Sequence, residues 1–187
     1  MSDAGLAWLH GLAAPDADHE LGSCCASPVW AAALVAGRPY PDLAALVARS
    51  DEIIAGLAWP EVLLALAAHP RIGQRPTGTG REASWSRREQ SGMDTASTEI
   101  RAALAEANRA YEDRFGHVLL IFAAGLADGQ LLAAARSRLG NDERTERRLV
   151  RANLARIAAL RVRGLVESGP RRAAPATQIG HDPGGVR

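Results

Sequence analysis

Residues 142–166 read DERTERRLVRANLARIAALRVRGLV, and this stretch decides the expected fold. Asp142 is a good N-cap, and apolar side chains recur after it at intervals of three and four residues. That spacing predicts one long helix that ends at about Val166 and buries a single face. The face comprises Leu154, Ile157, Ala158, Arg161 and Leu165. Near the start, arginines alternate with acidic residues, which is typical of a solvated helix surface rather than a nucleic-acid footprint.

The composition favours helices throughout. The chain has 187 residues, of which 38 are Ala, and 47% are hydrophobic while only 4% are aromatic. This composition predicts a core of Leu, Ala, Val and Ile, which favours helices. The length of the chain suits one domain of ordinary size. The 22 basic residues nearly balance the 21 acidic ones, so the overall charge does not favour binding to nucleic acid or to a membrane surface.

All 22 basic residues are arginines, and the chain contains no lysine. A Schiff base between a lysine and a carbonyl substrate or pyridoxal phosphate is therefore excluded. A Walker A phosphate-binding loop is excluded for the same reason, since its lysine has no candidate.

Proline, glycine and capping residues divide the rest of the chain into helical pieces. The expected helix starts are Pro28, Pro41-Asp42, Ser50 (a short helix), Trp59, the region of Ser86, Thr95 or Ser97, and Asp128. Gly37, Gly116 and Gly140 are candidate helix ends, and residues 73–83 form an expected loop. The apolar run Val118–Ala123 fits either a strand or the start of a buried helix. The prediction is an all-α domain of seven to nine helices.

The two ends of the chain carry no targeting signal that we can identify. Residues 1–167 form the expected domain, and residues 168–187, rich in Gly, Pro and Arg, form an expected disordered tail. The longest apolar run, Val118–Ala127, is about half of a membrane span. Cys24 and Cys25 are adjacent, which favours small buried side chains in a reducing compartment. We therefore expect a cytoplasmic protein that does not contact a membrane.

His69 is the first candidate for chemistry. It follows Leu66 by three residues and Val62 by seven, which places it on the apolar face at the C-terminal end of a helix. The negative end of the helix dipole predicts a raised pKa, suited to a general acid or base. The alternative is a histidine that only caps the last carbonyls. No histidine belongs to a recognisable metal-binding motif, so no metal site is expected.

Two further candidates each have a structural and a functional interpretation. Ser86 and Glu89 match the S-x-x-E capping box of a helix N-terminus, but the same N-terminus, with Gln90 beside it, suits an anionic or urea-like ligand. Arg161 lies on the apolar face of the last helix. It is either a snorkelling arginine or part of a structural ion pair, or else a forked donor for a carboxylate in a half-buried pocket.

Several blocks of sequence resemble the signature of the OHCU decarboxylases, enzymes that act on 2-oxo-4-hydroxy-4-carboxy-5-ureidoimidazoline (OHCU). The blocks are His69-Pro70-Arg71-Ile72-Gly73, Trp85-Ser86-Arg87-Arg88-Glu89-Gln90-Ser91-Gly92 and Asn108-x-x-Tyr111-x-x-Arg114-Phe115-Gly116. Supporting blocks are Cys24-Cys25, Ser27-x-x-Trp30, Arg38-Pro39-Tyr40, Arg138-Leu139-Gly140-Asn141 and Ile157-x-x-Leu160-Arg161. The resemblance covers roughly residues 20 to 166.

The resemblance implies an all-helical, cofactor-free decarboxylase, commonly a homodimer, that converts OHCU to (S)-allantoin and CO2 in urate breakdown. It implies that His69 is the catalytic histidine, Glu89 its carboxylate partner and Arg161 the site arginine. Positions matching substrate contacts are Pro70, Ser86, Gln90 and the backbone of Ile121, Phe122, Ala123 and Ala124. Leu119 and Leu126 depart from the family pattern, in which Phe and a basic residue are usual. The alternative is a catalytically inactive binding or adaptor domain of the same fold.

Overall fold

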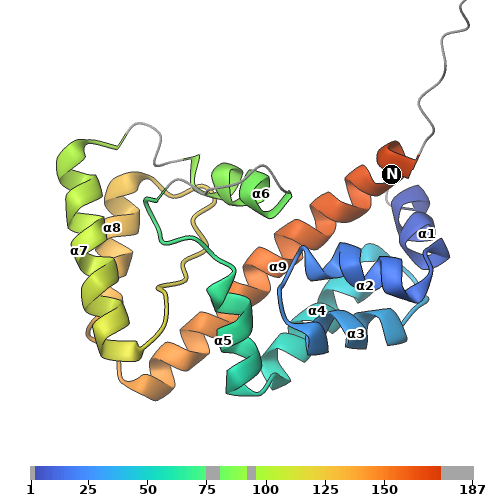
Figure 1. The fold of residues 1–187 in the computed structure, drawn as a ribbon, viewed down its shortest axis with the longest axis horizontal. Helices are drawn as coiled ribbons and strands as arrows, with labels where there is room; N and C mark the ends of the chain where they lie inside the picture. The colour runs from blue at the N-terminus through green and yellow to red at the C-terminus, as the bar shows by residue number, and fades with distance from the viewer. Residues whose placement is uncertain (1–2, 75–80, 92–95, 174–187) are drawn as a thin grey trace, which may run out of the picture.

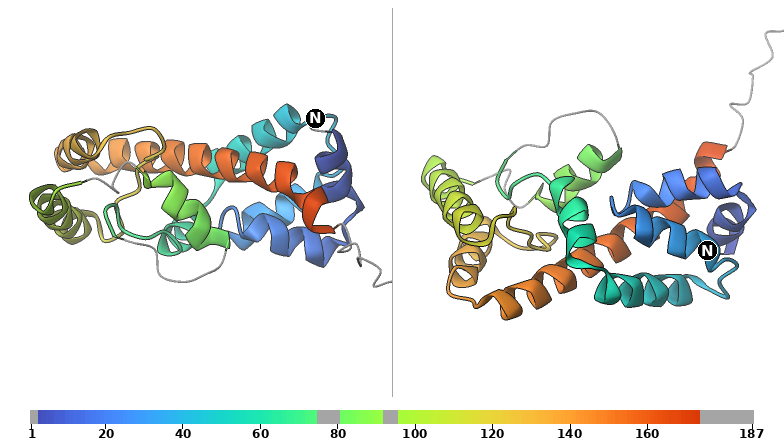
Figure 2. Two further views of the ribbon diagram at one scale, coloured as in Figure 1. Left: turned by 90° about the horizontal axis from the view of Figure 1, so that it is seen from above. Right: turned by 60° about the horizontal axis from the view of Figure 1, so that its bottom comes forward.

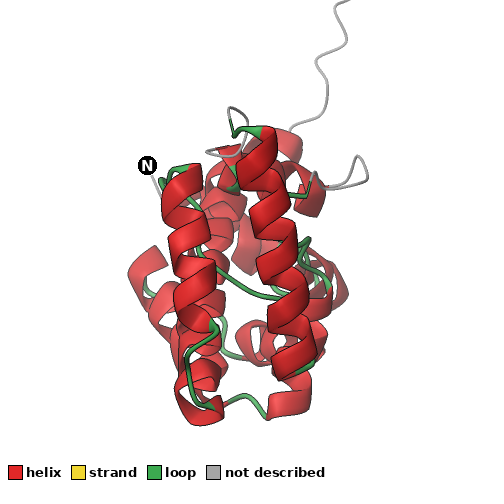
Figure 3. Cartoon of the chain, turned by 90° about the vertical axis from the view of Figure 1, so that its left-hand side faces the viewer, coloured by secondary structure: helices red, strands yellow, loops and turns green. Residues whose placement is uncertain are grey.

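A computed structural model describes residues 3–74, 81–91 and 96–173 of the chain. Within these ranges the protein consists of helices and connecting loops, without strands (Figure 3). The nine helices are α1 (Asp3–Gly11), α2 (Ala14–Gly22), α3 (Pro28–Ala36), α4 (Leu43–Gly56), α5 (Trp59–Ala67), α6 (Arg81–Glu89), α7 (Thr98–Phe115), α8 (Asp128–Arg138) and α9 (Glu143–Ala173). The all-α prediction is confirmed.

The long helix α9 crosses the whole molecule and organises the other elements (Figure 1). Helices α1 to α4 gather around its C-terminal half, where α1 and α4 pack directly against it. Helices α7 and α8 pack against each other at the opposite end, and α5 and α6 lie between the two groups. The segment that decided the predicted fold is therefore the helix against which α1 and α4 pack.

The buried apolar side chains form two clusters rather than one. The first is built from α1 to α5 and α9, with the fully buried Trp30 among its largest members. The second is built from α7 and α8, together with Ile72 and three residues of the segment 119–123. Leu120 belongs to the first cluster and its neighbours Leu119 and Ile121 to the second, so the two clusters adjoin along this segment.

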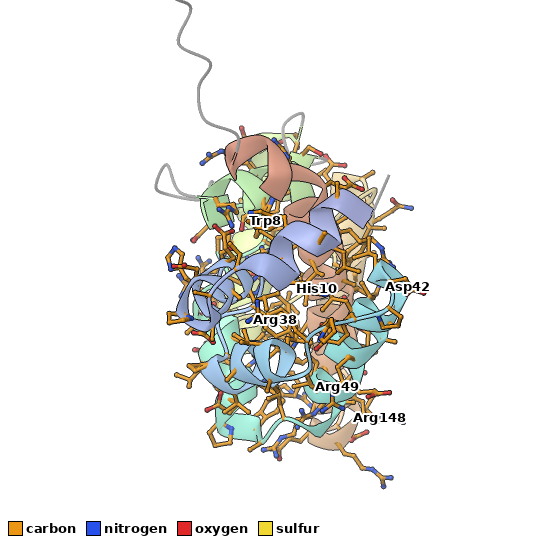
Figure 4. The ribbon with its side chains drawn as sticks, turned by 90° about the vertical axis from the view of Figure 1, so that its right-hand side faces the viewer. Trp8, His10, Arg38, Asp42, Arg49 and Arg148 are labelled. Carbon is orange, nitrogen blue, oxygen red and sulfur yellow. The ribbon has the colours of Figure 1, made fainter. Side chains whose placement is uncertain are left out.

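Polar contacts fix α1 at the far end of the molecule. The Arg38 guanidinium donates to the carbonyl oxygens of Leu9 at 2.8 Å and Leu12 at 2.9 Å. His10 Nε2 accepts from the Tyr40 N–H at 3.1 Å. Figure 4 shows His10 and Arg38 close together beneath α1. The two Arg38 contacts satisfy carbonyls at and just beyond the end of α1.

Most predicted helix boundaries are confirmed. Ser27, Asp42, Ser97 and Asp142 each cap a helix through a side-chain oxygen that accepts a backbone N–H. Gly116 ends α7 in the left-handed conformation, with φ of 73°. Each of these signals lies within a few residues of the boundary that it marks, which is why it can be read from the sequence.

Three local predictions were wrong. Ser50 does not begin a helix: α4 runs through it, and its hydroxyl accepts from the buried Trp30 indole N–H at 3.1 Å. Ser86 and Glu89 do not form an N-terminal capping box, because α6 begins at Arg81 and places both in its later turns. The segment 118–123 is neither strand nor helix. It is part of the irregular connection between α7 and α8 (Figure 1).

The end of α9 also differs from the prediction. The helix continues to Ala173, past the expected end at Val166 and into the expected tail. Gly169 lets Trp8 of α1 pack directly on this added part of the helix, because a Cβ there would clash with the Trp8 ring. Residues 174–187, the remainder of the expected tail, lie outside the described residues.

The cysteine prediction is confirmed as far as burial is concerned. Cys24 and Cys25 are both free and buried in the first cluster, and burial raises the pKa of each thiol. In the described part of the chain, no helix is long and apolar enough to cross a membrane.

The close approach of α1 to α9 gives a test of the packing. A Cβ on Gly5 would lie 2.0 Å from the Val166 carbonyl oxygen, whereas one on Gly11, at the end of the same helix, meets nothing within 4 Å. We expect Gly5→Ala to lower the free energy of unfolding by at least about 2 kcal/mol, because backbone must move. Gly11→Ala should leave it unchanged or slightly raised. Urea unfolding of the two variants measures this, and equal values would contradict the described α1–α9 contact.

Candidate active site

A small cavity lies where the two apolar clusters meet. Its walls come from the end of α5, from α6, from α9 and from the extended segment 119–123. The lining residues are His69, Pro70, Ile72, Ser86, Glu89, Gln90, Leu119, Leu120, Ile121, Ala123 and Ile157. Its volume is about 20 Å³, enough for a water molecule. Its polar lining residues are His69, Ser86, Glu89 and Gln90, and the others are apolar.

His69 comes directly after α5, where Pro70 ends the helical path, and its N–H donates to Leu66 O at 2.9 Å. The side chain is 8% exposed. Burial, and secondarily the positive charge of Arg161, lower the pKa of His69 to about 3. The prediction of a raised pKa was wrong, because loss of hydration and a nearby cation outweigh the helix end. His69 is therefore a neutral imidazole at physiological pH.

Glu89 and Arg161 form a forked ion pair beside this histidine. Arg161 Nε donates to Glu89 Oε1 at 2.8 Å, and Nη2 donates to Oε2 at 2.9 Å. The Arg161 and Glu89 side chains are 5% and 11% exposed. Nη2 also donates to the Ser86 hydroxyl at 3.3 Å. These contacts hold α6 alongside α9 (Figure 2).

The structure confirms one interpretation of Arg161 from the sequence, the structural ion pair. Arg161 is half of an internal ion pair, and it is also a forked donor to a carboxylate at the cavity wall, with Glu89 as that carboxylate. Trp85, one turn before Glu89 on α6, lies 5.8 Å from the Arg161 guanidinium and from that of Arg81. The aromatic ring keeps the guanidinium in place from the other side.

The Gln90 side chain already makes one hydrogen bond within the protein. Its Oε1 accepts from the Gly73 N–H at 2.9 Å, so the oxygen of the amide faces the 69–73 turn. The NH2 group and one remaining lone pair on Oε1 are the parts of the Gln90 amide left for the urea-like ligand that the sequence suggested. The same bond connects α6 to the turn that carries His69.

The extended wall 119–123 has no ladder of backbone hydrogen bonds and is held by side chains instead. Arg138 Nη1 donates to Leu120 O at 3.2 Å, and Asn153 Oδ1 accepts from Phe122 N at 2.7 Å. Arg138 itself is fixed by Glu146, with Nε 2.8 Å from both carboxylate oxygens. Tyr111 and Asn141 donate to the same carboxylate.

Most of the residues expected at the site lie together, but two do not. His69, Pro70, Ser86, Glu89, Gln90, Ile121 and Ala123 line the cavity, and Arg161 contacts it through Glu89. Phe122 and Ala124 are not among the lining residues. The Phe122 ring instead lies under Arg156 at 4.1 Å, and its N–H is occupied by Asn153.

Sequence reasoning missed the apolar part of the cavity. Ile72, Leu120 and Ile157 line it, and they look like ordinary core residues in the sequence. Leu119, noted as a departure from the family pattern, also lines the cavity, so that departure acts on the shape of the site. Leu126 packs against the second cluster instead. Among the described residues, no group of three His, Cys, Asp or Glu side chains could share a metal ion.

Comparison with solved structures identifies similar folds. A structure described as OHCU decarboxylase in the presence of (S)-allantoin superposes with a TM-score of 0.69 at 24% identity, covering 79% of this chain and 97% of that one. A structure of (S)-allantoin synthase gives 0.64 at 18% identity, over 86% of this chain and 53% of that one.

Curated relatives point the same way. An Amia calva 2-oxo-4-hydroxy-4-carboxy-5-ureidoimidazoline decarboxylase is 28% identical over 142 residues, 75% of this chain and 81% of the relative. An Arabidopsis thaliana uric acid degradation bifunctional protein is 27% identical over 74% of this chain, and the match spans 44% of that longer protein. The family model for OHCU decarboxylase matches residues 10–163, most of the length of the chain. The chain therefore belongs to the OHCU decarboxylase family.

Proposed function

We propose that this protein catalyses the decarboxylation of OHCU to (S)-allantoin and CO2 without a cofactor. The observation that carries the proposal is the joint placement of His69, Glu89 and Gln90 on one cavity wall, in a chain of this family. An adaptor domain of the same fold would have no use for a buried neutral imidazole next to a forked carboxylate.

The substrate supplies the electron sink that a lysine-free chain lacks. Its carboxylate stands on a carbon next to a C=N group. When the bond to CO2 breaks, the electron pair forms a C=C bond and the C=N electrons move to nitrogen, which takes a proton. Transfer of the hydroxyl proton to the neighbouring carbon then gives the product. This sink does the work that pyridoxal phosphate performs elsewhere.

His69 serves as the base in this scheme because it is neutral before the substrate binds. The substrate's carboxylate brings a negative charge beside the ring, which raises the pKa of His69 and makes it a better proton acceptor. Each Glu89 oxygen keeps a lone pair beyond those used by Arg161, so it can accept from a substrate N–H or O–H.

Arg161 and Gln90 supply the donors. Arg161 uses Nε and Nη2 on Glu89 and Ser86, so Nη1 is the atom placed to meet an anionic substrate oxygen. The Gln90 NH2 group can donate to a carbonyl of the ureido group or the ring. A cavity of about 20 Å³ is far smaller than typical ligand pockets, so substrate binding must separate its walls.

The first test is the reaction itself. Substrate is generated in situ from urate with urate oxidase and hydroxyisourate hydrolase, and circular dichroism follows the appearance of (S)-allantoin. We expect the protein to accelerate this step. His69→Ala should lower the rate by about 100-fold or more, since general acid–base catalysis contributes that much.

His19→Ala provides the matched control, because His19 is exposed and lies away from this cavity. It should leave the rate unchanged, and both variants should keep the helical far-UV spectrum. A wild-type rate equal to spontaneous decay would contradict the proposed function and favour a binding domain.

The ion pair can be separated into its structural and chemical parts by a double-mutant cycle. Glu89→Met or Arg161→Met alone leaves a buried charge without its partner and should cost about 3–5 kcal/mol of unfolding free energy. The double variant replaces both charges and should recover most of that stability. Its activity should stay at least about 100-fold below wild type. Recovery of activity together with stability would mean that the pair is structural only.

The low pKa of His69 predicts an acid-sensitive fold. Below pH 6.5 the unfolded chain binds a proton at His69, whereas the folded protein binds it only near pH 3. Lowering the pH from 7 to 4 should therefore destabilise wild type relative to His69→Gln by roughly 2–3 kcal/mol. Urea unfolding across this range measures the difference. A pH-independent difference would contradict the neutral imidazole.

A further inference from the structure

The turn formed by residues 69–73 carries His69 and Pro70 to the cavity without regular secondary structure. The position of such a turn depends on contacts from outside it. Three side chains make these contacts: Gln90 accepts from the Gly73 N–H, Glu112 binds the Arg71 guanidinium, and Asn108 donates to the Ile72 carbonyl oxygen. Two of the three, Asn108 and Glu112, stand one turn apart on α7.

The contacts from α7 are not equivalent. Arg71 binds Glu112 with two 2.6 Å hydrogen bonds, but its side chain is 44% exposed, and exposed ion pairs contribute little to stability. Asn108 is 1% exposed, and its Nδ2 lies 2.9 Å from Ile72 O. Asn108 therefore provides the buried contact that fixes the middle of the turn.

The other end of the Asn108 amide has no partner. Its Oδ1 is the one buried side-chain N or O atom without a hydrogen bond in the described part of the chain. An unpaired buried acceptor costs about 1–3 kcal/mol, which offsets the gain from the Nδ2 bond. The Asn108 amide therefore adds little to the stability of the fold. Its donor is directed at the Ile72 carbonyl oxygen, which indicates a role in placing the turn.

We propose that Asn108 is a positioning residue for the catalytic histidine, acting through its hydrogen bond to the Ile72 carbonyl oxygen. Ile72 itself lines the cavity, three residues after His69, so a shift of its carbonyl moves both an apolar wall and the imidazole. A displacement of about 1 Å at a reacting group can cost 100-fold in rate. The inference rests on the proposed decarboxylation for its kinetic test, and a spectroscopic readout tests it separately.

The kinetic test uses Asn108→Leu, which keeps the volume but removes the donor. We expect kcat to fall at least tenfold with KM changed by less than about twofold, since His69 is misplaced while the groups on α6 stay. Tyr40→Phe is the control: it also deletes a buried donor to a backbone carbonyl, Leu34 O at 2.8 Å, outside the cavity. It should lose similar stability and keep kcat. An unchanged kcat in Asn108→Leu would overturn the proposal.

Asn108→Asp gives a second, sharper variant. A protonated carboxyl in this buried place can donate to Ile72 O as the amide does, whereas a carboxylate repels that oxygen. Burial raises the pKa of a carboxyl, so the donor form gains population as the pH falls. The ratio of variant to wild-type kcat should therefore rise from pH 8 to pH 6, while the ratio for Asn108→Leu stays flat. A flat ratio for Asn108→Asp would contradict the donor role.

NMR of the His69 ring tests the positioning without any turnover. In Asn108→Leu the loosened turn exposes the imidazole to water, so its titration midpoint should move upward by at least about one pH unit from the wild-type value, with Tyr40→Phe unchanged. An inactive wild type with this shift would refute the decarboxylation and support the positioning. An active wild type with no shift in Asn108→Leu would refute the positioning alone.

Discussion

The buried ion pair between Glu89 and Arg161 is the constraint on which the site depends. Removing both charges from water is expensive, and the attraction between them does little more than repay that cost. The pair contributes little net stability but fixes geometry, because either charge alone would be costly to bury. It holds α6 to α9, which places Ser86 and Gln90 at the cavity, and the charge of Arg161 helps to keep His69 neutral.

A second buried pair plays the corresponding part at the other end of α9. Glu146 receives hydrogen bonds from Arg138, Tyr111 and Asn141, and although burial raises its pKa, these donors hold the pKa below the ordinary value. Arg138 extends from this carboxylate to the wall of the cavity at Leu120. One long helix thus carries a member of each buried pair, and the two pairs fix two parts of the cavity wall, Glu89 and Leu120.

Features that depend on residues close together in the sequence could be predicted, whereas features that depend on contacts between distant segments could not. Ser27 and Asp142 cap their helices through groups three residues away, so the sequence alone predicts those starts. Ser50 offers the same local signal, but its hydroxyl serves Trp30, and only the packing of α3 on α4 shows this. His69 lines the cavity, but the direction of its pKa shift was predicted wrongly, because the helix end is visible in the sequence and burial is not. The resemblance gave roles to His69, Glu89 and Arg161, whereas Asn108 stood in one of its sequence blocks without a role.

A neutral histidine next to an internally paired carboxylate suits both proton transfers of the proposed reaction, the uptake of a proton by His69 and its return. Before the substrate binds, burial and Arg161 keep the imidazole unprotonated. The anionic substrate favours the imidazolium, so binding itself creates the conditions for His69 to take a proton. That cation is stable only while the negative charge remains beside it. Once CO2 has left, its electron pair stays on the ring nitrogen of the intermediate, which takes the proton from the imidazolium and so restores the neutral ring. The low pKa makes His69 a weak base before the substrate binds, but it also makes the imidazolium a strong acid that returns its proton.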